Sequence, residues 1–472
     1  MIKFKLFPVF LILLLVSCTT RVKWISSTSN VSWVKEQPLT VNSSTAQYDV
    51  KIDTTQKLQS VEGFGACFNE LGWVALNRLM PAARDSVFTE LFSPGVGANF
   101  NVCRMPVGAN DFSRDWYSYN ETEGDFDMNN FSIDNDKETL IPFIHEALKK
   151  NPNLKIWASP WSPPVWMKWN KHYACRVPWE ELDEKFHNNL PYDRQGAEGT
   201  NMFIQEDEYF KAYALYFTKF IEAYKNEDIN IAAIMPQNEF NSCQIFPSCT
   251  WTAGGLAKFI GNYLGPAMEN QHVETMFGTM ERPTVAMVDT ILNDPKAGKY
   301  IQCIGFQWAG KKAIPEVHQK YPDMKLYQTE QECGDGKNDW EYCLYAWSLM
   351  KHYFNNGVNA YMYWNMALDE GGYSRWGWQQ NSLVTVDTLT NTYRYNYEYY
   401  LMKHVSHFVK PGAHLLKTNG EFNDLLAFQN TDMSIVLIIY SDVVKQLNIN
   451  IGSKSISPKL DARSFNTFVI RE

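Results

Sequence analysis

The stretch Ile-Ala-Ala-Ile-Met-Pro-Gln-Asn-Glu, residues 231–239, starts apolar and β-prone and ends in a carboxylate beside polar groups. A second stretch, Lys-Leu-Tyr-Gln-Thr-Glu at residues 325–330, has the same design. Each pattern predicts a strand that runs through a core and delivers an acid at its carboxyl end. Two such acids on one rim suit glycoside hydrolysis, in which one protonates the leaving oxygen and the other attacks or shields the anomeric carbon. Ordinary strand-end ion pairs would use the same residues, so the rest of the chain has to decide between the two interpretations.

Around these two stretches, short apolar runs alternate with amphipathic helical segments. The predicted strands are residues 61–64, 101–105, 155–158, 231–235, 274–278, 301–306, 325–328 and 360–364. Eight strands alternating with helices favour a parallel (β/α)₈ barrel over a doubly wound sheet. We expect this barrel to occupy residues 61–405, and the 472-residue chain is long enough for it and a smaller module, since a barrel takes about 250 residues.

The end of the chain has a different pattern. Residues 425–429, 434–440, 446–451 and 464–470 are β-prone runs separated by turn residues. Residues 49–58 have the same character. The sequence therefore predicts a β-sandwich built from residues 406–472 and completed by N-terminal strands in residues 46–60.

The N-terminus has the features of an export signal. Lys3 and Lys5 precede an apolar run at residues 6–16, which is too short to span a bilayer, and Leu-Val-Ser-Cys at residues 15–18 resembles a bacterial lipoprotein cleavage site. We expect a signal peptide at residues 1–17, a lipid anchor on Cys18 and a polar tether over residues 18–45. This predicts an exported bacterial lipoprotein held at the outer membrane through its lipid alone. The alternative is an ordinary signal peptide with an incidental cysteine.

The composition narrows the class of partner. The formal net charge is −9, which gives no electrostatic footprint for nucleic acid. The chain is rich in aromatic residues, with 16 Trp, 25 Tyr and 28 Phe, and rings of this kind stack on the apolar faces of sugars as well as packing in cores. We expect a monomer that binds a glycan.

Export would permit disulfides. Cys243 and Cys249 are close enough in sequence to close a small loop, and several other cysteines lie in strand-like runs typical of buried thiols. No cysteine spacing matches a zinc site. We expect neither a metal nor an organic cofactor.

Several motifs follow the predicted strands and bring acids, amides and tryptophans to one rim, which is typical of a sugar cleft. They are Gly-Phe-Gly-Ala-Cys-Phe-Asn-Glu at 63–70, Asn-Asp-Phe-Ser at 110–113, Ser-Pro-Trp-Ser-Pro-Pro-Val-Trp-Met-Lys at 159–168, Gln-Trp at 307–308 and Tyr-Trp-Asn-Met-Ala-Leu at 363–368. With Gln-Asn-Glu at 237–239, the Gly-Phe-Gly, Asp-Phe-Ser, Ser-Pro-Trp-x-x-Pro-x-Trp-Met-Lys and Trp-Asn-x-Ala-Leu motifs occur in an order that resembles glycoside hydrolase family 30, which includes glucosylceramidases and endo-β-1,6-glucanases. The resemblance implies a barrel with an attached sandwich and a retaining hydrolase acting on a β-glucoside.

The resemblance also implies roles for individual residues. Glu239 matches the acid/base, Glu330 the nucleophile, and Asn238 the amide that binds the sugar 2-hydroxyl. Arg104 matches an arginine near the two carboxylates. The positions expected to line the first sugar subsite are Glu70, Trp161, Trp308, Trp364 and Asn365.

The chain departs from the family pattern at three places. Many relatives have Asp where this chain has Glu70, and Phe240 replaces a Pro that often follows the acid/base. Glu332 lies two residues after Glu330 and remains an alternative nucleophile.

Residues 171–205 look like those of the endo-β-1,6-glucanase subgroup, with Trp166, Trp169 and Trp179 as candidate sugar platforms or as packing residues. We therefore expect an endo-acting enzyme that cleaves β-1,6-glucan. An exo-acting β-glucosidase or glucosylceramidase is the first alternative, and a glycan-binding surface lipoprotein without catalysis is the second.

Overall fold

A computed structural model describes residues 21–471. Eight parallel strands close into a barrel, which confirms the predicted fold class. These strands are β6 (Gly63–Cys67), β7 (Val102–Pro106), β8 (Lys155–Ser159), β9 (Ile231–Ile234), β10 (Glu274–Met280), β11 (Ile301–Gln307), β12 (Lys325–Glu330) and β13 (Ala360–Asn365). Each one overlaps a stretch that the sequence predicts as a strand.

The barrel strands are largely buried because helices cover their outer side. All residues of β6, β7 and β13 are buried, as expected for parallel strands covered on both faces. Gly65 shows why the Gly-Phe-Gly motif needs its second glycine, since a Cβ there would lie 1.8 Å from the Val102 carbonyl oxygen of the neighbouring strand. The motif therefore sets the close approach of β6 to β7.

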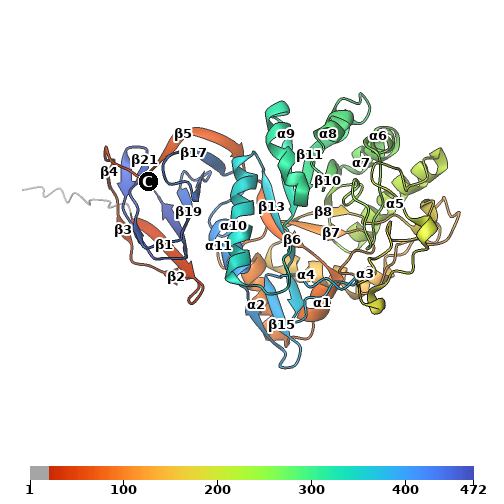
Figure 1. Cartoon of the computed structure of the whole chain (residues 1–472), viewed down its shortest axis with the longest axis horizontal. Coiled ribbons are helices and arrows are strands. Elements are labelled where there is room, and N and C mark those ends of the chain that lie inside the picture. Colours follow the sequence, from red (N-terminus) through yellow and green to blue (C-terminus); the bar gives the residue numbers. More distant parts are fainter. Residues whose placement is uncertain (1–20, 472) are drawn as a thin grey trace, which may run out of the picture.

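The helices that follow the strands form the outer layer of the barrel. They include α2 (Pro81–Phe92), α4 (Leu140–Lys150), α5 (Asp207–Asn226), α8 (Val285–Leu292), α9 (Ile314–Lys320), α10 (Trp340–Asn355) and α11 (Tyr397–Ser406). Figure 1 shows α10 and α11 between the barrel and the second module.

The second module is built from both ends of the described chain. Its main sheet has the order β2-β1-β24-β19-β18-β17-β5-β21-β22-β4, in which β2 (Val34–Lys35), β4 (Asn42–Ser43) and β22 (Lys454–Ile456) are short strands. In it, β5 (Val50–Ser60) pairs with β17 (His414–Gly420) and β21 (Ile449–Ile451), so an N-terminal strand lies within the C-terminal module (Figure 1). The other long strands are β18 (Leu425–Gln429), β19 (Ile435–Ser441) and β24 (Ser464–Ile470).

The predicted tether is wrong for residues 21–28, and also for residues 34–35, 39–40 and 42–43, which form short strands of the same sheet. The first of these segments is β1 (Arg21–Thr28), which pairs antiparallel with β24 from Val22 opposite Ile470 to Thr28 opposite Ser464. Val22 and Ile25 are buried, and the apolar residues at positions 22, 24 and 25 are the sequence feature that does not fit a polar tether. The signal peptide and Cys18 lie outside the described residues.

Two features of the barrel were not predicted in detail. Residues 160–206 form a long insertion between β8 and α5, and three short strands follow β13, namely β14 (Ala367–Asp369), β15 (Val384–Asp387) and β16 (Thr392–Tyr395). Within residues 21–471, no helix combines the length and apolar character needed to cross a membrane.

Candidate active site

Glu239 and Glu330 converge at the carboxyl ends of the barrel strands. Glu330 is the last residue of β12, and Glu239 lies in the loop after β9, with both side chains lining one cavity of about 200 Å³. Gln307, the last residue of β11, donates through Nε2 to Oε1 of Glu239 at 3.0 Å and to Oε2 of Glu330 at 3.3 Å. One amide therefore bridges the two carboxylates.

Glu330 accepts hydrogen bonds from Arg104 and Trp308 in addition to the one from Gln307. Nη1 of Arg104 lies 2.9 Å from its Oε2, and the indole N–H of Trp308 donates to its Oε1 at 3.1 Å. Burial raises the pKa of Glu330, whereas the charge of Arg104 and these hydrogen bonds oppose the rise. The fully buried Arg104 thus supplies the positive charge that stabilises the ionised form of Glu330.

Glu239 has the opposite balance. Burial, and then the negative charge of Glu330, raise its pKa to about 8, and the hydrogen bond from Gln307 offsets only part of this. In this pair the proton resides on Glu239 and the charge on Glu330. Two neighbouring carboxyls with pKa values pushed apart are the arrangement that divides the roles of acid and nucleophile.

The backbone is in an uncommon conformation at two of these positions. Glu239 has a φ of 47° and Trp308 a φ of 48°, in the left-handed region that residues other than glycine rarely adopt. The backbone N–H of Glu239 is fixed by Oγ1 of Thr279 at 2.9 Å. Such conformations persist only where the surroundings enforce them, and they cluster at functional sites.

Asn238 is oriented by its carbonyl oxygen. Oδ1 accepts from Nη2 of Arg104 at 2.7 Å and from Oγ1 of Thr279 at 3.1 Å, so the amide nitrogen is the end that faces the cavity. Asn238 can therefore donate to a ligand hydroxyl beside the two carboxylates. Trp161 and Trp308, also predicted as subsite residues, line the same cavity.

Two predicted subsite residues lie behind the cavity wall. Trp364 is 1% exposed and packs against Trp161, with ring centroids 5.4 Å apart. Asn365 donates to Oε1 of Gln380 at 3.0 Å, and Gln380 lines the cavity. Both residues therefore support the cavity wall indirectly, Trp364 by packing against Trp161 and Asn365 through its hydrogen bond to Gln380.

The prediction for Glu70 does not agree with the structure. Its carboxylate accepts from the backbone and side chain of Arg114 at 3.0 and 3.1 Å, and from Asn135 and Thr139. As the first residue of α1 (Glu70–Leu76), it turns toward the loop after β7 and fixes that loop. Its role here is an ion pair rather than contact with the cavity.

Asp111 lines the cavity, whereas the sequence predicted Glu70 as the acid at this position. Burial and the charge of Glu330 raise the pKa of Asp111 to about 8. Its buried Oδ1 has no hydrogen-bond partner of good geometry among the described residues, although the indole of Trp376 is near enough to lower the pKa of the carboxyl. Asp111 belongs to the Asn-Asp-Phe-Ser motif, which the sequence predicts to lie on the rim without identifying this aspartate as a site residue.

Glu332, the alternative nucleophile, lies elsewhere. It forms an ion pair with Lys311, and the hydroxyl of Tyr345 donates to its Oε2 at 2.6 Å. It does not line the cavity of Glu239. The strand register therefore puts Glu330, and not Glu332, beside the acid/base candidate.

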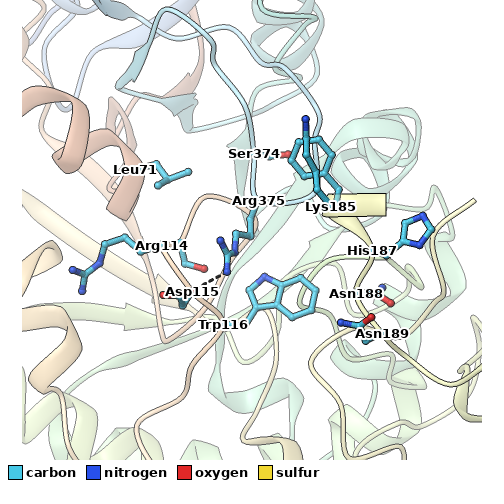
Figure 2. Close-up of a pocket in the computed structure, with 12 residues that line it drawn as sticks. Leu71, Arg114, Asp115, Trp116, Lys185, His187, Asn188, Asn189, Ser374 and Arg375 are labelled. Atoms are coloured by element: carbon cyan, nitrogen blue, oxygen red, sulfur yellow. Dashed lines mark hydrogen bonds and ion pairs between the residues drawn. The ribbon is translucent and has the colours of Figure 1, made fainter. Parts of the chain in front are cut away.

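A larger cavity of about 590 Å³ adjoins the first one. It lies between the loop after β7, the insertion and the segment that connects β14 to β15, and the backbone N–H of Arg375 in its wall donates to the carbonyl of Asp111 at 2.8 Å. Figure 2 shows the ring of Trp116 between the Asp115–Arg375 ion pair and the side chains of Asn188 and Asn189. Aromatic and amide groups on one surface suit a sugar.

A row of tryptophans leads outward from the smaller cavity. Successive ring centroids are 5.6 Å apart from Trp308 to Trp378, 5.4 Å from there to Trp376, and 5.9 Å from there to Trp179. Trp179 is 50% exposed, whereas Trp166 is buried and donates to the carbonyl of Asn120. Of the three candidate platforms, Trp179 and the half-exposed Trp169 remain accessible and Trp166 packs in the loop.

Similar proteins include both enzyme types expected from the motifs. The chain is 31% identical over 401 residues to a putative glucosylceramidase 4 of Caenorhabditis elegans, covering 79% of this chain and 72% of the relative. It is 28% identical over 401 residues to an endo-1,6-beta-D-glucanase of Aspergillus fumigatus, covering 80% and 76%. Among solved structures, the endo-beta1,6-glucanase BT3312 superposes with a TM-score of 0.79 at 24% identity, covering 96% of this chain and 100% of that one, which shows a shared fold.

The family-level assignment rests on the barrel. The family model described as "Glycosyl hydrolase family 30 TIM-barrel domain" matches residues 61–187 and 193–409. These residues span the barrel and include both carboxylates. The chain therefore belongs to glycosyl hydrolase family 30 and is a glycoside hydrolase.

Proposed function

We propose that this hydrolase cleaves β-1,6-glucan within the chain, with retention at the anomeric carbon. The observation that carries retention is the bridge from Gln307 to both carboxylates. Because Nε2 lies 3.0 Å from Oε1 of Glu239 and 3.3 Å from Oε2 of Glu330, these oxygens are no further apart than the sum of the two distances, about 6.3 Å, whereas inverting enzymes separate their carboxyls by roughly 6.5–9.5 Å.

In the first step, Glu330 attacks the anomeric carbon and forms a covalent glycosyl ester, while Glu239 gives its proton to the leaving oxygen. The negative charge of Glu330 is consumed in the ester, so the main charge that raised the pKa of Glu239 after burial is removed. Glu239, now ionised, can then take a proton from water as that water attacks the ester carbon. The second step frees the sugar and returns the proton to Glu239.

The neighbouring residues support this sequence of steps. Arg104 and Trp308 hold Glu330 ionised and fix its two oxygens, which keeps the attacking atom in place. Asn238, oriented by Arg104, would bind the 2-hydroxyl, and Asp111, whose buried Oδ1 lacks a hydrogen-bond partner among the described residues, would accept a hydrogen bond from another sugar hydroxyl.

Action within the chain is supported by the second cavity. The side of the smaller cavity that holds Glu239 is formed by loops after β9, β10 and β11. The larger cavity is lined in part by the loops after β7 and β13, and these loops also carry Asp111 and Trp376 of the smaller cavity. The larger cavity would thus receive sugar units on the side away from the leaving group. The endo-1,6-β-glucanase relatives are consistent with this substrate.

An exo-acting glucosylceramidase is the second candidate. Trp179, Leu182, Gly377 and the neighbouring tryptophans form an open apolar surface beside the site, which would also suit a lipid aglycone. The relatives called putative glucosylceramidases favour the same alternative.

Product analysis over time separates the two candidates. Hydrolysis of pustulan should release mixed short oligosaccharides early, with the new reducing ends appearing first as the β-anomer by NMR. Release of glucose alone from the first time points, or a preference for glucosylceramide over pustulan, would contradict the proposal in favour of the exo alternative.

We also propose that the protein is an exported lipoprotein anchored through Cys18. The basic start, the apolar run and the Leu-Val-Ser-Cys sequence support it. The anchor would hold the enzyme at the outer membrane, where a polymeric substrate is accessible.

A further inference from the structure

Cys175 and Cys243 face each other where the insertion meets the loop of the acid/base candidate. The Cys243 thiol contacts the carbonyl of Cys175 at 3.4 Å, and the Cys175 thiol contacts the carbonyl of Ser248 at 3.2 Å. Each of the two thiols is among the groups that shift the pKa of the other, as expected for neighbouring side chains. All eight cysteines of the described chain are free thiols.

The backbone, and not only the rotamers, brings these cysteines together. The N–H groups of Cys175 and Arg176 both donate to the carbonyl of Gln244, each at 3.0 Å. Ala174 and Pro247 form an antiparallel bridge just beyond. The two segments, 68 residues apart in sequence at the cysteines, are therefore fixed side by side.

The surroundings favour thiolate chemistry at Cys175. Burial raises its pKa, but the hydrogen bond from Cys243 and the positive charge of Lys168 outweigh burial and lower the pKa to about 6. The pKa of Cys243 is raised, chiefly by the hydrogen bond with Cys175 and by burial. These opposite directions favour the thiolate on Cys175 over the thiolate on Cys243. Cys243 is partly exposed, so it is the sulfur that an external disulfide can reach.

We propose that Cys175 and Cys243 form a disulfide that joins the insertion to the acid/base loop. Formation needs a carrier disulfide, either a small molecule or a protein, as the oxidant. The Cys175 thiolate takes the proton of Cys243, and the Cys243 sulfur attacks the carrier, forming a mixed disulfide and expelling one carrier thiolate. That carrier thiolate takes the proton from Cys175 and so regenerates the Cys175 thiolate. The Cys175 thiolate then attacks Sγ of Cys243 and expels the second carrier thiolate, which takes its proton from water. Two protein sulfurs are oxidised, and one carrier disulfide is reduced to two thiols.

The bond would affect the reaction cavity through Gln244. This residue follows Cys243 directly, and its Nε2 lies 3.4 Å from Oε2 of Glu239. Its backbone carbonyl is the acceptor shared by Cys175 and Arg176. The disulfide would therefore stabilise the wall of the cavity on the leaving-group side, as well as restricting the unfolded chain between the two cysteines.

The short loop from Cys243 to Cys249, which sequence spacing made possible, is disfavoured by the structure. Cys249 is fully buried, and its thiol contacts the carbonyl of Thr250. Cys243 turns instead toward Cys175 across the junction. Cys249 therefore provides a matched control, since it is near both partners but is not expected to pair.

The test is disulfide mapping of the full-length protein. The reduced protein is incubated with oxidised glutathione, alkylated, digested without reduction and analysed by mass spectrometry, while free thiols are counted in denaturant. We expect two fewer free thiols than in the reduced chain and a linked peptide pair containing Cys175 and Cys243. The Cys175→Ser and Cys243→Ser variants should each lose the link, and Cys249→Ser should keep it.

Other outcomes overturn the proposal. An unchanged thiol count, or a link through Cys249 in the wild-type protein, contradicts it directly. The unfolding temperature gives a second readout: the oxidised wild-type protein should unfold several degrees above the reduced form, and this difference should vanish in Cys243→Ser and persist in Cys249→Ser. An equal unfolding temperature for oxidised and reduced wild-type protein would refute the proposed joining of the two segments.

Discussion

Arg104 and Glu330 form a buried ion pair in the mouth of the barrel, with Nη1 of Arg104 2.9 Å from Oε2 of Glu330. The arginine is 0% exposed, and its guanidinium lies 4.3 Å from the ring centroid of Trp161. A buried arginine keeps its charge and requires an anion beside it. This pair therefore assigns the negative charge to Glu330 and leaves Glu239 as the carboxyl that carries the proton.

Replacing Glu330 with Gln should reduce hydrolysis of pustulan by several orders of magnitude, because the amide cannot form the glycosyl ester. Glu332→Gln is the matched control, since it differs by two positions and lies outside the cavity, and it should retain activity within a few fold. A 2-fluoroglucoside that acts by trapping the ester should label Glu330, as peptide mapping can show. Labelling of Glu332 would reverse the assignment.

The pH profile should report the raised pKa of Glu239. Because its folded pKa is about 8, Glu239 is protonated below this value, and kcat/KM should fall as the pH rises through about 8 and the acid is lost. The acidic side of the profile should follow protonation of Glu330, the two limbs belonging to the pair as a whole. In Glu239→Gln, assayed with an aryl glucoside whose leaving group needs no acid, the alkaline limb should disappear. An unchanged alkaline limb in that variant would contradict this role for Glu239.

Asp111→Asn should reduce activity and yet stabilise the fold at alkaline pH. The pKa of Asp111 is raised to about 8 in the folded protein, so its contribution to stability is complete below the unfolded value of about 4 and is lost as the pH rises to 8. Asn does not titrate. Thermal unfolding of the two proteins should therefore agree near pH 4 and diverge in favour of the variant by pH 8, and a parallel pH dependence would be evidence against a buried neutral Asp111.

Glu70→Gln should destabilise the fold and leave activity on small substrates nearly unchanged. The change removes the ion pair with Arg114 and should lower the free energy of unfolding by about 1.5–3 kcal/mol. Activity on a small aryl glucoside should change little, because the side chain lies outside the cavity. Denaturant unfolding and initial rates measure the two effects, and a loss of activity comparable to that of Asp111→Asn would show that Glu70 contacts the substrate after all.

Trp116→Ala should weaken binding of long β-1,6-glucans without affecting small substrates. If the ring supports sugar units in the larger cavity, KM for pustulan should rise roughly tenfold, which corresponds to about 1.4 kcal/mol. Trp116→Phe keeps an aromatic surface and should show a smaller rise. The aryl glucoside, which occupies only the smaller cavity, should be hydrolysed at the wild-type rate by both variants. Equal losses on both substrates would argue against a separate binding role for the larger cavity.

Cys18→Ala should release the enzyme from membranes while leaving its specific activity intact. The lipid would be attached to Cys18 alone, and no catalytic residue depends on that position. Fractionation of cells expressing each form, followed by activity assays of the fractions, measures both effects. An alanine variant that still sediments with membranes would contradict the anchor.

The sequence by itself determined the barrel and its two acids. Apolar runs such as residues 231–235 and 325–328 have to be buried on both faces, and their alternation with amphipathic helices leaves few architectures available. Glu239 and Glu330 follow strands directly, so their place on one rim was a consequence of parallel strands whose carboxyl ends meet there. β1 could have been inferred in the same way from its buried Val22 and Ile25, but a polar, signal-adjacent segment was interpreted as a tether.

Only the tertiary structure decided which side chains enter the cavity. Glu70 and Asp111 are both acids in rim motifs, but their roles differ. The Glu70 carboxylate forms an ion pair with Arg114, whereas the Asp111 carboxyl is buried beside Glu330. Glu332 was excluded from the cavity by Lys311 and Tyr345, which are distant along the chain or on another element. The proximity of Cys175 to Cys243 has the same origin. Hydrogen bonds, charge and burial depend on neighbours that folding brings from distant positions, and spacing along the sequence does not encode them directly.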